Sequence, residues 1–167
     1  KFVTVPLTVN FGTESFADGV EIDNDTFYAK LVTSDVMPTT SQPTPDAFAK
    51  AFKEITDAGD EAVVITISSK LSGTYQSATI AAEDFAGKVF VVDGYTVAIG
   101  TGALAEYARN LADSGKSAAE IVEILEKDKE DIRVFAVVDT LEYLKKGGRV
   151  SAAVAFAGGL LNFKPVI

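Results

Sequence analysis

Three stretches of this chain, residues 62–67, 88–93 and 132–138, are almost continuously apolar. Short runs of this kind are typical of strands that are covered on both faces, as in a parallel sheet. Residues 3–11 form a further strand-type run near the start of the chain. The pattern therefore predicts four strands, of which the last three belong to one parallel sheet.

Helical patterns separate these strands. Apolar residues at spacings of three and four predict helices over residues 45–58 and 98–114. Ser117 and Glu120 then form the capping box that opens a further helix. The alternation of strands and helices predicts an α/β fold, a three-layer parallel sheet flanked by helices with right-handed crossovers.

Two segments depart from this alternation. Residues 7–22 are interpreted as a β-hairpin that extends from the sheet, with its turn at Gly12, Thr13 and Glu14. Residues 33–45 contain three of the five prolines and many hydroxyl side chains, which predicts a rigid loop. The expected architecture is one α/β domain with a β-hairpin extension.

The composition limits the chemistry that this chain can perform. It has no cysteine and no histidine, which removes disulfides, thiolate or imidazole catalysis and the commonest metal ligands. A formal net charge of −9 disfavours nucleic-acid binding, which needs a basic surface. No apolar stretch reaches the ~20 residues that span a bilayer. We expect a cytoplasmic protein without a metal or a cofactor.

The turn that follows residues 62–67 carries the strongest functional signal. It contains Ser72 and Gly73 and leads into a helical pattern at residues 77–86. A helix N-terminus offers unsatisfied N–H groups and about half a positive charge, so neutral donors there favour a small anion. The lysine of a phosphate-binding P-loop does not follow the glycine. The plainer alternative is an ordinary strand-to-helix connection that Ser72 or Thr74 caps.

A second hydroxyl-rich segment, residues 39–43, includes Thr40 and precedes the predicted helix at residues 45–58. Its plainer interpretation is a loop that supplies Thr44 as the N-cap of that helix. Loops at the carboxyl ends of parallel strands line the ligand crevice of open α/β sheets. The two hydroxyl-rich segments are therefore expected to meet at one site.

Two C-terminal segments carry the remaining candidates. The sequence predicts a helix at residues 140–146 that ends at Gly147 and Gly148, and the lysines in its last turn complement the negative end of the helix dipole. This account does not explain Arg149, which is therefore a candidate partner for an anion. Residues 152–161 are apolar on all sides, which is typical of a core helix. The alternative for that segment is one wall of a hydrophobic ligand tunnel.

Several blocks of the chain occur together in a fixed order, namely Thr40-Ser41-Gln42-Pro43 and residues 5–12, 68–78, 141–151 and 160–167. In this order they resemble the DegV family of bacterial fatty-acid-binding proteins over essentially the whole chain. The resemblance implies an α/β domain that binds a long-chain fatty acid and presents its carboxylate to a separate fatty acid kinase. It also implies that Thr40 and Ser72 hold the carboxylate.

The chain differs from the family pattern in three places. Family members usually start with a strand that ends in a Thr-Asp-Ser turn, and they continue into a second, smaller α/β domain. We therefore expect residues 1–167 to be one lipid-binding domain of a longer protein, without that first strand and without the C-terminal domain. Where the family often has Asp-Ser, this chain has Asp93 and Gly94.

The resemblance favours a carrier without catalytic activity. Its expected partners are a long-chain fatty acid and a fatty acid kinase, with transient contact with a membrane. We expect Arg149 to lie outside the pocket and to contact the kinase, because a long cation beside a Gly-Gly turn is usually exposed. The residues alone leave two alternatives, an enzyme acting on a small phosphorylated or carboxylated metabolite and a purely structural fragment.

Overall fold

The computed structural model of the chain describes residues 1–150. The chain divides into two compact units, Lys1–Ile132 and a second unit that begins at Arg133. The candidate residues at 152–161 lie outside the described part, so the choice between a core helix and a tunnel wall stays open.

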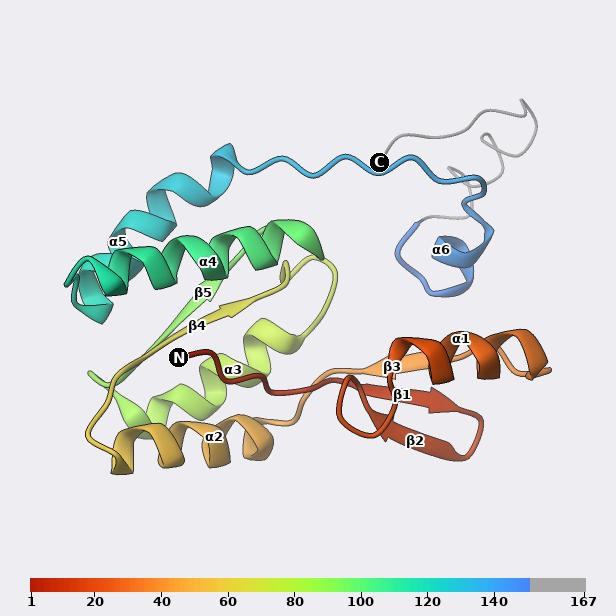
Figure 1. The fold of residues 1–167 in the computed structure, drawn as a ribbon, viewed down its shortest axis with the longest axis horizontal. Helices are drawn as coiled ribbons and strands as arrows, with labels where there is room; N and C mark the ends of the chain where they lie inside the picture. The colour runs from red at the N-terminus through yellow and green to blue at the C-terminus, as the bar shows by residue number, and fades with distance from the viewer. Residues whose placement is uncertain (151–167) are drawn as a thin grey trace. The chain divides into compact units, whose positions relative to one another are not determined.

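A parallel pair of strands forms the centre of the first unit (Figure 1). Strand β4 (Ala62–Thr66) pairs with β5 (Val89–Asp93), from Ala62 opposite Val89 to Thr66 opposite Asp93. Helices α2 (Pro45–Asp57) and α3 (Thr74–Ala82) pack on one face, and a short 3-10 turn η1 (Glu83–Phe85) follows α3. Helices α4 (Ile99–Asp113) and α5 (Ala118–Asp128) pack on the other, and a 3-10 turn η2 (Lys129–Asp131) follows α5. The predicted α/β fold, with helices on both faces of a parallel sheet, is confirmed.

The apolar spacing of each helix explains which face it buries. In α2, Phe48 and Phe52 lie one turn apart and are buried together with Ala78 of α3. On the other face of the sheet, Leu104 of α4 and Leu125 of α5 are fully buried against β5. Residues at spacings of three and four share one side of a helix, so each helix contributes one apolar stripe to its core.

A second sheet carries the hairpin. Strands β1 (Thr8–Phe11) and β2 (Glu14–Ala17) are antiparallel and are joined by a turn at Gly12, where φ is +61°. The hairpin prediction is confirmed, but the hairpin belongs to a separate three-stranded sheet of order β2-β1-β3. Strand β3 (Thr39–Ser41) comes from the segment that was predicted to be a loop, and that part of the loop prediction is wrong.

Helix α1 (Asn24–Thr33) has no counterpart in the sequence predictions. None of its residues is buried, and Phe27 reaches the small core of Val9, Phe11 and Ile22 only in part. Asp23 caps the helix by accepting a hydrogen bond from the Thr26 N–H. A helix that buries so few side chains shows no clear 3.6-residue period of apolar residues in its sequence.

The predicted strand at residues 132–138 is absent, and this prediction is wrong. Phe135 and Val137 are 74% and 67% exposed, so the apolar run is not covered on both faces here. An apolar run forms a strand only where its backbone groups find an edge to pair with. The amino-acid composition of an apolar run does not show whether such an edge is available to it.

The described part of the second unit contains one short helix, α6 (Glu142–Lys146). Lys146 forms an ion pair with Glu142 at 2.7 Å. The helix ends at Gly147 and Gly148, and Gly148 has φ +76°. The stop at the glycine pair agrees with the sequence prediction.

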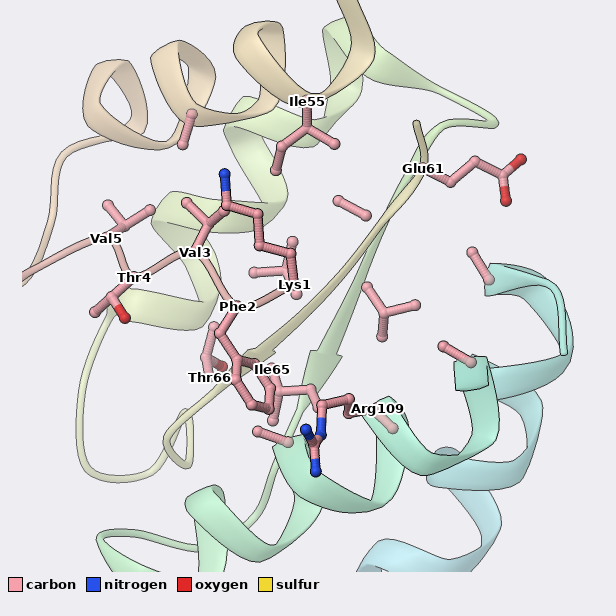
Figure 2. Close-up of a pocket in the computed structure, with 18 of the residues that line it drawn as sticks. Lys1, Phe2, Val3, Thr4, Val5, Ile55, Glu61, Ile65, Thr66 and Arg109 are labelled. Carbon is pink, nitrogen blue, oxygen red and sulfur yellow. The ribbon is translucent and has the colours of Figure 1, made fainter. Parts of the chain in front are cut away.

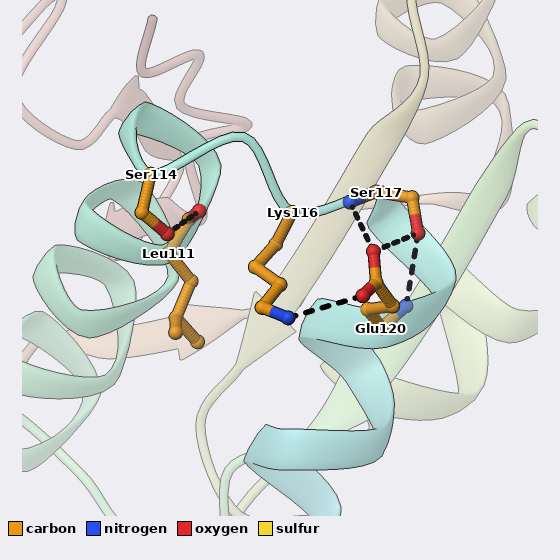
Figure 3. Close-up of polar contacts among 5 residues, drawn as sticks. All are labelled: Leu111, Ser114, Lys116, Ser117 and Glu120. Carbon is orange, nitrogen blue, oxygen red and sulfur yellow. Dashed lines mark hydrogen bonds and ion pairs between the residues drawn. The ribbon is translucent and has the colours of Figure 1, made fainter.

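The capping box at the start of α5 is confirmed (Figure 3). The Glu120 carboxylate accepts hydrogen bonds from the Ser117 N–H and hydroxyl, each at 2.9 Å, and from Lys116 at 3.1 Å. These hydrogen bonds, those from Ser117 first, lower the pKa of Glu120 from 4.5 to about 2.

We therefore expect the Glu120 carboxyl to titrate near pH 2 in a carbon-detected NMR titration. Because the folded pKa lies below the unfolded one, the stability that this carboxylate contributes is present above about pH 4.5 and is lost as the pH falls toward 2. A Glu120 midpoint at the ordinary value of 4.5 would show that the capping box does not persist in solution.

Candidate functional site

The turn between β4 and α3 gathers hydroxyl and N–H groups. The N–H groups of Leu71 and Ser72 donate to the Ser68 carbonyl at 2.9 and 3.2 Å, which folds the turn tightly. The Ser72 hydroxyl accepts the Thr74 N–H at 3.3 Å and lies 2.8 Å from the Thr74 hydroxyl. Gly73 is the N-cap and has no side chain to occupy the free N–H groups of the first turn. The Thr74 N–H is already bonded to the Ser72 hydroxyl, and the other N–H groups at this helix start stay available to an anion.

The structure brings the two predicted hydroxyl-rich segments together through Gln42. Its amide nitrogen donates to the buried Ser77 hydroxyl of α3 at 2.9 Å. A Cβ atom at Gly73 would lie 2.2 Å from the Gln42 amide oxygen, so Gln42 packs directly on the Gly73 backbone. Only glycine leaves room for this contact.

Thr40 lies two residues before Gln42, at the centre of β3. It is exposed and is paired with Val9 across the sheet. Among the described residues, no hydrogen bond joins Thr40 to Ser72. The predicted pair thus belongs to two adjoining segments, and Gln42 makes the contact between them.

The loop after β5 is tied to the turn after β4. The Asp93 carboxylate is buried and accepts the N–H groups of Ser69 at 3.0 Å and Tyr95 at 3.2 Å. The Ser68 N–H donates to the Thr96 carbonyl at 2.8 Å. As the position of loops in open α/β sheets predicts, both connections meet at the carboxyl end of the parallel strands.

The backbone of this second loop is strained. Tyr95 and Ala98 have φ values of +53° and +52°, and they are the only described residues other than glycine with positive φ. Such conformations cost of order 1–3 kcal/mol each and cluster at ligand-binding segments. Tyrosine and alanine have no preference for positive φ. The strained backbone of this loop could therefore not be predicted from the sequence.

The polar turn borders an apolar surface. Tyr95 and Val97 are 52% and 40% exposed on the loop that Asp93 and Thr96 tie to the turn, and Ile99, the first residue of α4, is 78% exposed. The ammonium group of the buried Lys129 lies 4.3 Å from the centroid of the Tyr95 ring and 2.7 Å from a Glu126 carboxylate oxygen. The site therefore combines neutral hydrogen-bond donors with exposed apolar side chains.

Arg149 belongs to the second compact unit. Its side chain is exposed, and one guanidinium nitrogen donates to the Gly147 carbonyl. Its own N–H donates to the Leu144 carbonyl at 2.9 Å. The exposure agrees with the expectation for a long cation beside a Gly-Gly turn.

Replacing Gly73 with alanine is expected to displace Gln42, because the new Cβ atom cannot share space with its amide group. Loss of the Gln42–Ser77 hydrogen bond should lower the free energy of unfolding by about 1 kcal/mol. Urea denaturation measures this loss, and the Gln42 amide resonances report the displacement. Gly102→Ala is the matched control, because a Cβ atom there meets nothing within 4 Å. Unchanged Gln42 resonances in Gly73→Ala would contradict the packing.

Among the described residues, no helix is long and apolar enough to cross a membrane.

Comparison with known proteins gives consistent matches. The model of a family described as "Uncharacterised protein, DegV family COG1307" matches residues 1–167. A DegV domain-containing protein of Deinococcus radiodurans is 39% identical over 163 residues, which cover 98% of this chain and 58% of that protein. The chain therefore spans well under two thirds of this relative.

Solved structures match the fold as well. A DegV family protein of Thermus thermophilus, described by its fatty acid binding, superposes with a TM-score of 0.86 and 41% identity over 97% of this chain and 58% of that one. The Fatty Acid Kinase (Fak) B3 protein of Streptococcus pneumoniae, loaded with linoleic acid, gives a TM-score of 0.83 and 28% identity over 99% of this chain and 59% of that one.

Proposed function

This chain belongs to the DegV family, and we propose that it binds a long-chain fatty acid and presents the carboxylate to a fatty acid kinase. One observation carries the proposal: the donor-rich turn at Ser72 is tied directly to a loop that exposes Tyr95 and Val97. A fatty acid needs both elements, a polar site for its head group and an apolar surface for its chain.

In this proposal the carboxylate is held by neutral donors. The hydroxyls of Thr40 and Ser72 and the N–H groups beside Gly73 donate to its oxygens. A carboxylate at the mouth of an apolar tunnel loses hydrating water, and leaving it without partners costs several kcal/mol. Neutral donors replace the water without the strong ion pair of an arginine, so the acid stays available for phosphorylation.

The acyl chain supplies most of the binding free energy. At about 0.8 kcal/mol per methylene, burying a sixteen-carbon chain offers on the order of 11 kcal/mol before the costs of association. Tyr95, Val97 and Ile99 begin the apolar surface next to the head group. Residues 152–161 are the proposed tunnel wall and lie outside the described part of the chain.

Such a protein is a carrier and performs no chemistry itself. The solved relatives from Thermus thermophilus and Streptococcus pneumoniae are described by the fatty acids they bind, which supports a carrier. Phosphorylation of the acid then falls to a separate kinase, and the likeness of this chain to the lipid-loaded Fatty Acid Kinase (Fak) B3 protein supports such a partner. We propose that the protein acts in the cytoplasm and contacts the membrane transiently.

Lipid extraction from the purified protein tests the proposed function. After purification by native methods, the organic extract is analysed by mass spectrometry, and stoichiometric long-chain fatty acid is expected. Protein stripped of lipid should bind added palmitate and reject a sugar phosphate offered at the same concentration. An empty site that prefers the sugar phosphate would support the enzyme alternative instead.

Arg149→Ala is expected to keep bound lipid and to reduce phosphorylation of the acid by the kinase. The reason is that Arg149 is an exposed cation in the second unit and is available to a protein partner or to a phosphate. Lys145→Ala, which removes another exposed cation from the same segment, is the matched control. Loss of lipid from Arg149→Ala would instead assign Arg149 to the carboxylate site.

A further inference from the structure

The loop between β5 and α4, residues 94–98, is held in a strained conformation beside the proposed carboxylate site. Tyr95 and Ala98 both have positive φ, which residues with a side chain rarely adopt. Such a conformation persists only where the surrounding contacts over-determine it. The contacts that hold this loop therefore decide whether it stays next to the Ser72 turn.

Backbone contacts fix the first residues of the loop. The Gly94 N–H donates to the Thr66 carbonyl at 3.1 Å, and a Cβ atom at Gly94 would lie only 2.6 Å from that oxygen. The Tyr95 N–H donates to the Asp93 carboxylate at 3.2 Å. In the described part of the chain, no hydrogen bond reaches the Tyr95 hydroxyl. The position of the Tyr95 ring is therefore set by other contacts.

Two ammonium groups approach this ring. The Lys129 ammonium lies 4.3 Å from the ring centroid, and that of Lys70, in the turn after β4, lies 5.9 Å from it. A cation within about 6 Å of a ring centroid is attracted to the ring, and more strongly where water is excluded. The Lys129 side chain is only 6% exposed, whereas Lys70 is exposed to water. Lys129 therefore makes the stronger of the two contacts.

Lys129 is itself firmly placed at the end of α5. Its N–H donates to the carbonyl of Leu125, which is fully buried in the core. Its ammonium lies 2.7 Å from a Glu126 carboxylate oxygen. A buried lysine needs such a partner, and the end of a helix favours a cation. Lys129 thus connects the core that contains Leu125 to the ring of Tyr95.

The contact between Lys129 and Tyr95 is separate from a cavity of about 1220 Å³ that β4, α2 and α4 line (Figure 2). Thr66, which anchors Gly94, lines this cavity, but Tyr95 and Lys129 do not. An acyl chain that occupied the cavity would therefore not touch the Tyr95 ring. This difference gives the alternative that the experiment below must exclude.

We propose that Lys129 is a positioning residue for the fatty acid site, and this inference rests on the proposed function. Its ammonium holds the Tyr95 ring, and the ring keeps residues 94–98 beside the Ser72 turn in the conformation that receives the ligand. Lys129 does not touch the acid itself. It acts through Tyr95, whose exposed ring begins the apolar surface next to the head group.

The strain in the loop sets the size of the expected effect. A residue with positive φ gains free energy when it relaxes, by an amount that corresponds to about a tenfold change in population. Without the Lys129 contact, the loop would adopt the binding conformation about a tenth of the time. The apparent affinity falls by the same factor, because only that fraction of the protein is competent to bind.

Titration of the purified protein with palmitate tests the proposal. Lys129→Gln removes the charge, keeps much of the side-chain stem and should weaken binding about tenfold. Lys127→Gln is the matched control, because it removes an exposed cation from the same helix and should leave binding unchanged. Equal affinities of these two variants would overturn the proposal.

A double-mutant cycle shows whether Lys129 acts through the ring. Tyr95→Leu alone should weaken binding, and adding Lys129→Gln to it should cause no further loss. The exposed position of Tyr95 lets this variant fold. Unchanged affinity of Tyr95→Leu would place the acyl chain away from the ring, as in the cavity of Figure 2, and would overturn the proposal. A full tenfold loss from Lys129→Gln in the Tyr95→Leu background would overturn it as well.

Amide hydrogen exchange separates this proposal from the proposed function, because it needs no ligand. The Tyr95 amide should exchange at least tenfold faster in Lys129→Gln than in Lys127→Gln. The Phe52 amide in the core of α2 should exchange equally in both and is the reference for global stability. Failure of the unaltered protein to bind palmitate would count against the proposed function. Equal exchange of the Tyr95 amide in the two variants would overturn the role of Lys129, even in a protein that binds palmitate.

Discussion

Replacing Ser72 with alanine and Thr40 with valine together is expected to leave the protein folded and nearly free of fatty acid. Neither side chain is buried in a core, so the fold should survive. Hydrogen bonds to a charged group contribute about 1.5–3 kcal/mol each, so Ser72→Ala alone should weaken binding roughly tenfold or more. Losing both hydroxyls leaves the head group with backbone donors only.

Mass spectrometry of bound lipid and titration with palmitate measure this effect, and circular dichroism verifies the fold. Thr39→Val with Ser69→Ala is the matched control pair, because these exposed hydroxyls are the neighbours of Thr40 and of the Ser72 turn. The controls should keep full occupancy. Unchanged occupancy in the folded Thr40 and Ser72 double variant would remove the carboxylate assignment.

Leu104→Ala is expected to cause a large loss of stability. Leu104 is fully buried on α4, in the core formed with Val92, Ile121 and Leu125. Removing a buried leucine side chain costs about 2–5 kcal/mol, because the lost transfer free energy adds to that of the cavity left behind. Gly94 packs against Leu104, since a Cβ atom there would lie 3.3 Å from a Leu104 methyl carbon. The loss should therefore reach the loop that carries Tyr95.

Urea denaturation measures the effect. Asn110→Ala on the same helix is the control, because its exposed side chain should change stability by less than about 0.5 kcal/mol. A change for Leu104→Ala no larger than that of the control would contradict the packing of α4 on the sheet.

The elements that could be predicted from the sequence are the helices that bury one apolar face and the strands that are covered on both faces. Strands β4 and β5 and helices α2, α4 and α5 appear almost at their predicted boundaries, because each contributes a clear apolar stripe or run to a core. Helix α1 and strand β3 were missed, because α1 packs only Phe27 in part against a small core and β3 is exposed and depends on its pairing with β1. Residues 132–138 show the reverse case, an apolar run that forms no strand and leaves Phe135 and Val137 exposed.

The same distinction applies to the site. The turn at Ser72 and Gly73 was identified because a strand, a glycine turn and a helix start follow one another locally. The contact of Gln42 with Ser77 spans 35 residues of sequence, so no local pattern reveals it. The positive φ of Tyr95 is set by the hydrogen bond to Asp93 and by its neighbours rather than by any preference of tyrosine.

The contact of Gln42 with Gly73 and Ser77 connects the antiparallel sheet to the parallel one. A head group held by Thr40 on one sheet and Ser72 on the other would add a second connection across the same junction. By thermodynamic linkage, the binding free energy that the ligand gains from contacting both sheets equals the free energy by which it stabilises their association. Release of the acid would then require the contacts on both sheets to break, so its off-rate would depend on how firmly the two sheets are held together.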